Sequence, residues 1–265
     1  MSPYRPKKRL GQNFLKSPEV INRIIELVNP NENSTIVEIG PGRGVLTLPL
    51  AKSGAEVIAV EFDRDLIGYL TALLVDHSRA KILKEDFLKV TPTLLGTEQF
   101  SLVGNLPYNI SSPVVDWCLR FHKSLVQAVF MVQEETAHRL AANPGSRDWS
   151  PMSILTQWRF NVVLCFTVPP SSFQPEPEVN SAVIRLVPKS GVLQLPHQFE
   201  KVVRSSFRQR RKLLVNNLVP DIVPDTETAR ELISDLKWPA DTRAESLSID
   251  QFLKLTELLT TRKLI

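Results

Sequence analysis

Cysteine is scarce in this chain of 265 residues, which contains only two. Cys118 and Cys165 both lie in apolar stretches, so we expect small core side chains rather than a disulfide or a nucleophile. The four histidines show no metal-ligand spacing with one another or with the cysteines, and we therefore expect no metal site.

Long apolar runs are also missing. No stretch approaches 18 apolar residues, and no signal-peptide pattern opens the sequence. The basic start, with Arg5, Lys7, Lys8 and Arg9, lacks the apolar core of a secretory signal and the Ser-rich character of a transit peptide. These absences favour a soluble protein in the reducing cytoplasm, without a membrane partner.

Acidic residues are outnumbered by basic ones. The chain has a formal net charge of +4 and a sequence pI near 9.1, which favours a polyanionic partner. Its length is sufficient to bury a full core and to carry one large domain with a smaller one.

A glycine-rich turn follows the first apolar strand candidate. Residues 34–44 have the sequence STIVEIGPGRG, a β-branched run that ends in Gly40, Gly42 and Gly44. Such a turn brings backbone close to a nucleotide in α/β folds. The dinucleotide fingerprint is absent because Val45 stands where its third glycine belongs. No later Ser, Tyr, Lys or His pattern suggests hydride chemistry, so we exclude a nicotinamide dehydrogenase.

Polar side chains end the next strand candidates. Glu61 ends the apolar run EVIAVE, Asp86 ends AKILKED, and Asn105 follows FSLVG. A carboxylate about 20 residues after the glycine turn typically accepts the hydroxyls of a ribose. Either acid alone could be a solvated loop residue. Because ligands of open parallel sheets bind at the carboxyl ends of the strands, we expect these groups to meet in one crevice.

The tetrapeptide Asn105-Leu106-Pro107-Tyr108 is the most informative motif. The Asn105 side-chain oxygen and the peptide oxygen before Pro107 can accept both N–H groups of an exocyclic amine, and the tyrosine ring can stack on a base. Alone, the tetrapeptide also fits an ordinary turn at a strand end. Together with the upstream groups it favours alkylation of a nucleobase amine, with these four residues as the catalytic ones.

Strands and helices alternate from a helix expected over 17–29, capped by Ser17, to about residue 140. Strands expected at 162–168 and 181–187 are joined by a short Pro-rich elbow, so they are antiparallel neighbours. We predict an α/β fold with a Rossmann-like, mostly parallel sheet and an antiparallel terminal strand. This arrangement distinguishes class I methyltransferases from dehydrogenases.

Strand patterning stops after Pro188, and residues 197–265 look helical throughout. We predict a methyltransferase domain over 1–188, with a basic N-terminal arm, and a helical RNA-binding domain over 189–265. A basic run in the second domain fits a solvated helix face, and phosphate contacts are the alternative. The run comprises Arg204, Arg208, Arg210, Arg211 and Lys212.

Several motifs occur together and in order. They are KKRLGQNFL, EIGPGRG, VEFD, EDF, NLPYNISSP, PSSFQPEPEV and SFRQRRKLLVNNL, followed by the tail RAESLS. In this combination the chain resembles the ribosomal RNA small subunit adenine dimethyltransferases of the KsgA/RsmA type, over nearly its whole length.

The resemblance implies S-adenosylmethionine as methyl donor, two adjacent adenosines near the 3′ end of 16S rRNA as target, and a monomer acting in small-subunit biogenesis. Glu61 would bind the donor's ribose, Asp86 its adenine amine, and Asn105 would face its methionine end. The donor residues implied are Asn13, Leu15, Gly40, Glu61, Asp86 and Asn105. The target base would meet Asn105, the Leu106 carbonyl and Tyr108, with Phe173 on its other face.

Phe173 lies in the proline-stiffened segment FQPEP, where we expect a held, exposed ring. RNA contacts are expected at Arg208, Arg210, Arg211 and Lys212. The chain departs from the family at Asn180, where an acid is usual.

Three alternatives remain. A large-subunit rRNA adenine methyltransferase of the antibiotic-resistance kind shares fold and chemistry, but Leu106, the opening motif and the RAESLS tail favour the small-subunit type. A non-enzymatic RNA-binding or assembly factor on the same scaffold is disfavoured by the intact segment from Asn105 to Tyr108. A DNA adenine methyltransferase would need a larger recognition module than this helical tail.

Overall fold

The computed structural model describes Lys7 and residues 12–191 and 196–265. The expected basic residues Arg5, Lys8 and Arg9 lie outside these described residues. No helix in the described ranges is long and apolar enough to span a bilayer.

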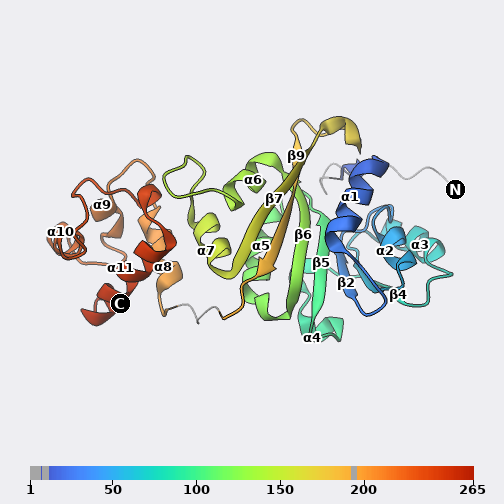
Figure 1. Cartoon of the computed structure of the whole chain (residues 1–265), viewed down its shortest axis with the longest axis horizontal. Coiled ribbons are helices and arrows are strands. Elements are labelled where there is room, and N and C mark those ends of the chain that lie inside the picture. Colours follow the sequence, from blue (N-terminus) through green and yellow to red (C-terminus); the bar gives the residue numbers. More distant parts are fainter. Residues whose placement is uncertain (1–6, 8–11, 192–195) are drawn as a thin grey trace. The chain divides into compact units, whose positions relative to one another are not determined.

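The first compact unit, Met1–Ala137 with Phe160–Lys189, contains a seven-stranded sheet (Figure 1). The strands lie in the order β4 (Ala80–Leu83), β3 (Glu56–Val60), β2 (Thr35–Ile39), β5 (Phe100–Asn105), β6 (Leu125–Gln133), β9 (Ser181–Pro188) and β7 (Phe160–Val168). Neighbours from β4 to β6 are parallel, whereas β9 is antiparallel to both β6 and β7. The predicted sheet and its antiparallel hairpin are confirmed. The antiparallel strand is last in the sequence but second from the edge in space.

The helices that accompany this sheet are α1 (Pro18–Val28), α2 (Thr47–Lys52), α3 (Arg64–Leu73), α4 (Pro92–Leu95), α5 (Ser111–Arg120) and α6 (Glu134–Leu140). Helices α2 to α5 lie in the connections between the parallel strands, whereas α1 precedes β2 and α6 follows β6. The expected first helix is confirmed. The Ser17 side chain accepts the Val20 N–H, and Asn29 ends the helix in the left-handed conformation with φ of 49°.

Two short strands were not anticipated. β1 (Phe14–Leu15) pairs with β8 (Phe173–Gln174) in an antiparallel two-stranded sheet. Strands of two residues carry no readable alternation, so no sequence pattern predicts them. Their pairing joins residues 12–15, here called the N-terminal segment, to residues 169–180 between β7 and β9, here called the Pro-rich elbow.

The carboxyl end of β5 lies unusually close to β2. A Cβ at Gly104 would be 2.9 Å from the Ile39 carbonyl oxygen and 3.1 Å from a methyl carbon of Leu106. Only glycine therefore fits at this position, one residue before Asn105.

The expectation that the third strand ends at Asp86 was wrong. β4 ends at Leu83, and Asp86 instead caps a short 3₁₀ helix, η2 (Phe87–Lys89), by accepting the Leu88 N–H at 3.0 Å. An Asp side chain competes for backbone N–H groups and so ends a strand rather than extending it.

The second compact unit, His138–Arg159 with Ser190–Ile265, is helical. Its helices are α7 (Pro151–Arg159), α8 (Phe199–Ser206), α9 (Leu214–Leu218), α10 (Thr226–Asp235) and α11 (Ile249–Thr261). The sequence placed residues 138–159 with the first domain. They pack with the second unit because the buried Trp149 donates its indole N–H to the Leu247 carbonyl at 2.9 Å, and Trp158 lies against Phe199.

Candidate active site

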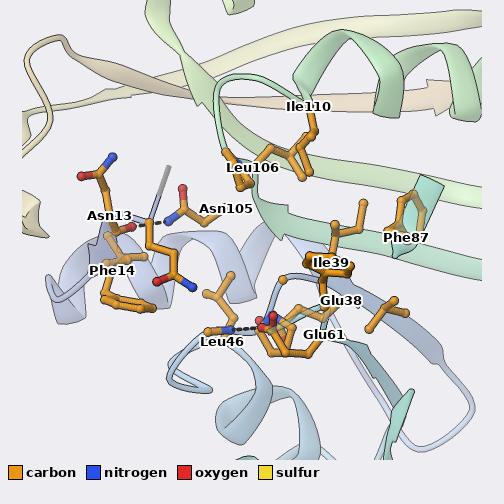
Figure 2. Close-up of a pocket in the computed structure, with 18 of the residues that line it drawn as sticks. Asn13, Phe14, Glu38, Ile39, Leu46, Glu61, Phe87, Asn105, Leu106 and Ile110 are labelled. Carbon is orange, nitrogen blue, oxygen red and sulfur yellow. Dashed lines mark hydrogen bonds between the residues drawn. The ribbon is translucent and has the colours of Figure 1, made fainter. Parts of the chain in front are cut away.

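A cavity of about 300 Å³, here called the strand-end cavity, opens at the carboxyl ends of β2, β3, β4 and β5 (Figure 2). Every residue that the sequence analysis assigned to donor or target base lines it. They are Asn13, Leu15, Gly40, Glu61, Asp86, Asn105, Leu106, Pro107, Tyr108 and Phe173. The chain thus gathers at one edge of the sheet groups that are up to 160 residues apart.

Asn105 is held by the N-terminal segment. Its side-chain Nδ2 donates a hydrogen bond to the Asn13 carbonyl oxygen at 2.9 Å, as Figure 2 shows. A carbonyl can only accept, so this bond fixes which end of the Asn105 amide faces Asn13. The Asn105 Oδ1 is left as an acceptor at the cavity wall.

The residues after Asn105 form a tight turn into α5. Leu106 is buried and donates its N–H to the Met131 carbonyl at 3.0 Å. The Pro107 carbonyl accepts the Ile110 N–H at 3.1 Å. The half-buried Tyr108 therefore sits on a backbone that is fastened on both sides.

Glu61 is buried and accepts two backbone N–H groups. Its Oε2 accepts from Gly42 at 3.2 Å and its Oε1 from Asp63 at 2.7 Å. Burial raises the pKa of Glu61, while these backbone hydrogen bonds oppose that effect. The carboxylate thus ties the glycine loop after β2 to the start of α3.

Gly42 is the glycine on which the loop geometry depends. Its φ is +57°, and a Cβ there would be 3.0 Å from the Phe14 ring. The Arg43 guanidinium lies 4.8 Å from the centroid of the same ring. The glycine loop and the N-terminal segment consequently pack directly against each other in the wall of the cavity.

Lys7 anchors the start of the chain to α3. Its Nζ lies 2.5 Å from Asp63 Oδ1 and 2.6 Å from Asp65 Oδ2, and Gln12 also donates to Asp63. The hydrogen bond to Asp63, with a second to Asp65, raises the pKa of Lys7. Sequence reasoning missed this tie because the partners are 56 residues apart.

Glu38 also belongs to the site, although the sequence did not predict it. This residue is 2% exposed, lines the cavity next to Ile39, and has an Oε2 without a hydrogen-bond partner among the described residues. Burial, together with the nearby charge of Glu61, raises the pKa of Glu38 to about 8. A Glu inside the apolar run TIVEI was the available signal, since a strand buried on both faces should carry no acid.

The position of Phe173 differs from the one predicted from the sequence. Its ring is 1% exposed and packs with Leu15 and Val103 in the core, so the expected exposed ring was wrong. The β1–β8 pairing places Phe173 opposite Leu15 and draws the elbow inward at this point.

The basic run from Arg204 to Lys212 also differs from its prediction. Only Arg204 lies in a helix, α8, while Arg208, Arg210, Arg211 and Lys212 lie in the loop of residues 207–213, here called the basic loop. The expected solvated helix face was therefore wrong. These four residues belong to the second unit and do not line the strand-end cavity.

The basic loop is held by internal contacts. The buried Asn217 donates to the carbonyls of Ser206 at 2.7 Å and Gln209 at 3.1 Å. Arg208 pairs with Asp221 at 3.0 Å and also donates to the Val219 carbonyl. Arg208 therefore stabilises the loop.

The exposed side chains of Arg211 and Lys212 make no hydrogen bond or ion pair with described residues. No group of three or more His, Cys, Asp or Glu side chains in the described part of the chain is arranged to hold a metal ion.

The sheet order, the antiparallel β9 between β6 and β7, and a glycine loop facing an acid after β3 define a class I methyltransferase fold. A family model described as ribosomal RNA adenine dimethylase matches residues 4–261. The chain belongs to this family of methyltransferases.

Relatives and solved structures agree with this membership. Ribosomal RNA small subunit methyltransferase A from Xylella fastidiosa is 40% identical over 261 residues, with 96% of each chain covered. The protein of that name from Francisella tularensis is 38% identical over 262 residues, covering 96% of this chain and 98% of that one.

A dimethyladenosine transferase from Plasmodium falciparum superposes with a TM-score of 0.80 at 26% identity, covering 95% and 98% of the two chains. The 23S rRNA methyltransferase ErmE gives a TM-score of 0.73 at 26% identity, covering 94% and 100%.

Proposed function

We propose that this protein transfers methyl groups from S-adenosylmethionine to the 6-amino groups of two adjacent adenosines near the 3′ end of 16S rRNA, two to each. It would act in the cytoplasm, as a monomer, during small-subunit biogenesis. The names of the curated relatives support the small ribosomal subunit as the target. The hydrogen bond between Asn105 Nδ2 and the Asn13 carbonyl is the observation that carries the mechanism.

The strand-end cavity fits the donor chemically. The donor supplies a methyl group on a sulfonium cation, and the Glu61 carboxylate, which accepts two backbone N–H groups at the cavity, offers a complementary charge. Gly40 lines the cavity with a φ of +60° and with no atom within 4 Å of the place a Cβ would take, so backbone can approach a ligand closely there. Glu61 would bind the ribose, Asp86 the adenine amine, and Asn13, Leu15 and Gly40 the remainder.

Asn105 and Leu106 hold the reacting amine in this proposal. The lone pair of an adenine amine is delocalised into the ring, so the amine is a weak nucleophile. In the first methyl transfer, hydrogen bonds from its two N–H groups to Asn105 Oδ1 and the Leu106 carbonyl favour a pyramidal nitrogen and return the lone pair to it. In the second transfer, the single N–H that remains donates to one of these two acceptors. The hydrogen bond from Asn105 Nδ2 to the Asn13 carbonyl holds the Asn105 Oδ1 in place as an acceptor before the base enters.

In this proposal, most of the rate enhancement of methyl transfer comes from orienting the adenine amine toward the methyl group of the donor. Holding a nucleophile in line with its electrophile can be worth roughly 7–11 kcal/mol. The alkylated amine loses its proton readily, so no strong base is needed. Tyr108, which is half-buried, offers stacking worth about 1–3 kcal/mol to a base that has left its own stack. The buried Phe173 contributes an apolar wall.

The test is methyl transfer onto small subunits purified from cells that lack the modification. We expect Asn105→Ala to reduce incorporation at least 100-fold, with the thermal unfolding temperature retained. Asn22→Ala, an equivalent truncation on the exposed face of α1, is the matched control and should keep wild-type rates.

Mapping the product separates the alternatives. Dimethyladenine blocks reverse transcription, so a stop near the 3′ end of 16S rRNA supports the proposal, while a stop only in large-subunit RNA contradicts it. Absence of both donor binding by calorimetry and methyl incorporation would favour a non-enzymatic RNA-binding factor. Full activity of Asn105→Ala would remove this residue from the mechanism.

A further inference from the structure

A second cavity lies beside the strand-end cavity, under the Pro-rich elbow between β7 and β9. This elbow cavity has a volume of about 780 Å³, within the range of pockets that bind small ligands. Gln12, Asn13, Arg43 and Tyr108 line both cavities. Tyr108 therefore borders two spaces, only one of which the proposed chemistry uses.

Amide side chains make up half of the polar lining of the elbow cavity. Gln133 and Gln174 join Gln12 there, and each amide both donates and accepts hydrogen bonds. A Gln amide matches the N6 and N7 edge of adenine with two hydrogen bonds. Proteins recognise unpaired RNA bases in this way, by the edge together with stacking on a flat side chain. Pro175 supplies further apolar surface.

The charges of the elbow cavity favour a base over a phosphate. Glu176 and Glu178 line it, and Arg43 is the one cation among its described lining residues. Carboxylates repel a phosphate but accept hydrogen bonds from an exocyclic amine or a 2′-hydroxyl.

The amides are carried by paired strands. Gln133 ends β6 opposite Ser181, and Gln174 lies in β8 opposite Phe14. Beyond the elbow, the Glu134 N–H donates to the Asn180 carbonyl, and the Asn180 amide donates to Glu134 Oε2, each at 3.1 Å. The backbone that carries Gln133 and Gln174 is therefore held in place before a ligand enters, which lowers the entropic cost of binding.

We propose that the elbow cavity binds the base of the nucleotide next to the reacting adenosine, and that Gln133 and Gln174 select adenine there. The inference rests on the proposed function, because it needs RNA in the strand-end cavity. Tyr108 lies between the two bases. A target of two adjacent adenosines fills both cavities, with one adenine reacting while the other is held.

The experiment uses small subunits reconstituted with 16S rRNA in which the neighbour of one target adenosine is adenosine, guanosine, cytidine, uridine or abasic. Methyl transfer to the remaining target adenosine is measured as kcat/KM. For the wild type we expect kcat/KM to be about 5- to 150-fold higher with adenosine than with the abasic neighbour. Gln133→Ala and Gln174→Ala should reduce this ratio toward one, with donor affinity by calorimetry unchanged.

Gln99→Ala is the matched control, since Gln99 donates to the Lys123 carbonyl and lines neither cavity. It should keep the wild-type ratio. Equal wild-type rates with adenosine and abasic neighbours would overturn the inference and leave the proposed function intact. Variants that slow every substrate equally would also overturn it, because such a loss is structural. Failure of the wild type on unsubstituted subunits would instead refute the proposed function.

Discussion

Replacing Glu38 by Gln should change how the stability of the donor-free protein depends on pH. Burial raises the pKa of Glu38 from 4.5 to about 8, so the folded protein keeps this proton up to about pH 8, whereas the unfolded chain loses it near pH 4.5. The protonated Glu38 therefore makes its full contribution to the free energy of unfolding below pH 4.5, and this contribution is lost as pH rises through 8.

The magnitude follows from that window. Between pH 4.5 and pH 8, each pH unit lowers the free energy of unfolding by about 1.4 kcal/mol through this one group. The free energy of unfolding of the wild type therefore falls by about 3–4 kcal/mol between pH 5 and pH 8. Glu38→Gln has no such proton to lose. The stability of the variant relative to the wild type should therefore increase by about 3–4 kcal/mol over the same interval.

Urea unfolding monitored by circular dichroism at pH 5, 6, 7 and 8 measures this difference, and titration of other groups largely cancels in it. Glu26→Gln makes the same chemical change on the exposed face of α1 and is the control. Its difference from the wild type should stay constant with pH. A constant difference for Glu38→Gln as well would refute the reasoning, since it would mean that Glu38 is ionised in the folded protein.

Three further predictions follow from the glycine loop and the basic loop. Gly42→Ala should weaken donor binding in calorimetry at least 10-fold, because Gly42 has a φ of +57° and a Cβ there would be 3.0 Å from the Phe14 ring. Gly68→Ala in α3 is the control and should leave donor affinity unchanged, because a Cβ at Gly68 has no atom within 4 Å. Asn217→Ala should lower the free energy of unfolding of the second unit by about 1–3 kcal/mol, since it removes the side-chain donor to the carbonyl of the buried Ser206 and to that of Gln209. Lys212→Ala should reduce the slope of log K against log salt for RNA binding by roughly 0.7–0.9 in filter-binding assays, and an unchanged slope would exclude a phosphate contact.

The sequence was sufficient for the elements whose evidence is local. Apolar runs and their flanking turns predicted the strands of the sheet, the hairpin of β7 and β9, and Asn105 at the end of β5. Strand ends of a parallel sheet meet at one edge, so these patterns also predicted one shared crevice. The structure places every residue assigned to donor and base in its wall.

Pairing between distant segments could not be read from such patterns. The β1–β8 pair buries Phe173, the ion pair of Lys7 with Asp63 holds the start of the chain, and the hydrogen bond that Asn105 donates to the Asn13 carbonyl orients the Asn105 amide. Each joins residues more than 50 positions apart, where periodicity carries no information.

The amino-acid sequence by itself determined the class of fold, the family and the set of polar groups at the strand ends, because hydrophobic periodicity and turn chemistry are local properties. Only the tertiary structure decided which of these groups are buried, which atom of Asn105 is left to accept, and that a second cavity adjoins Tyr108. Those outcomes depend on packing between segments that are distant in the sequence, because this packing determines how far each side chain is buried and which groups it can hydrogen-bond.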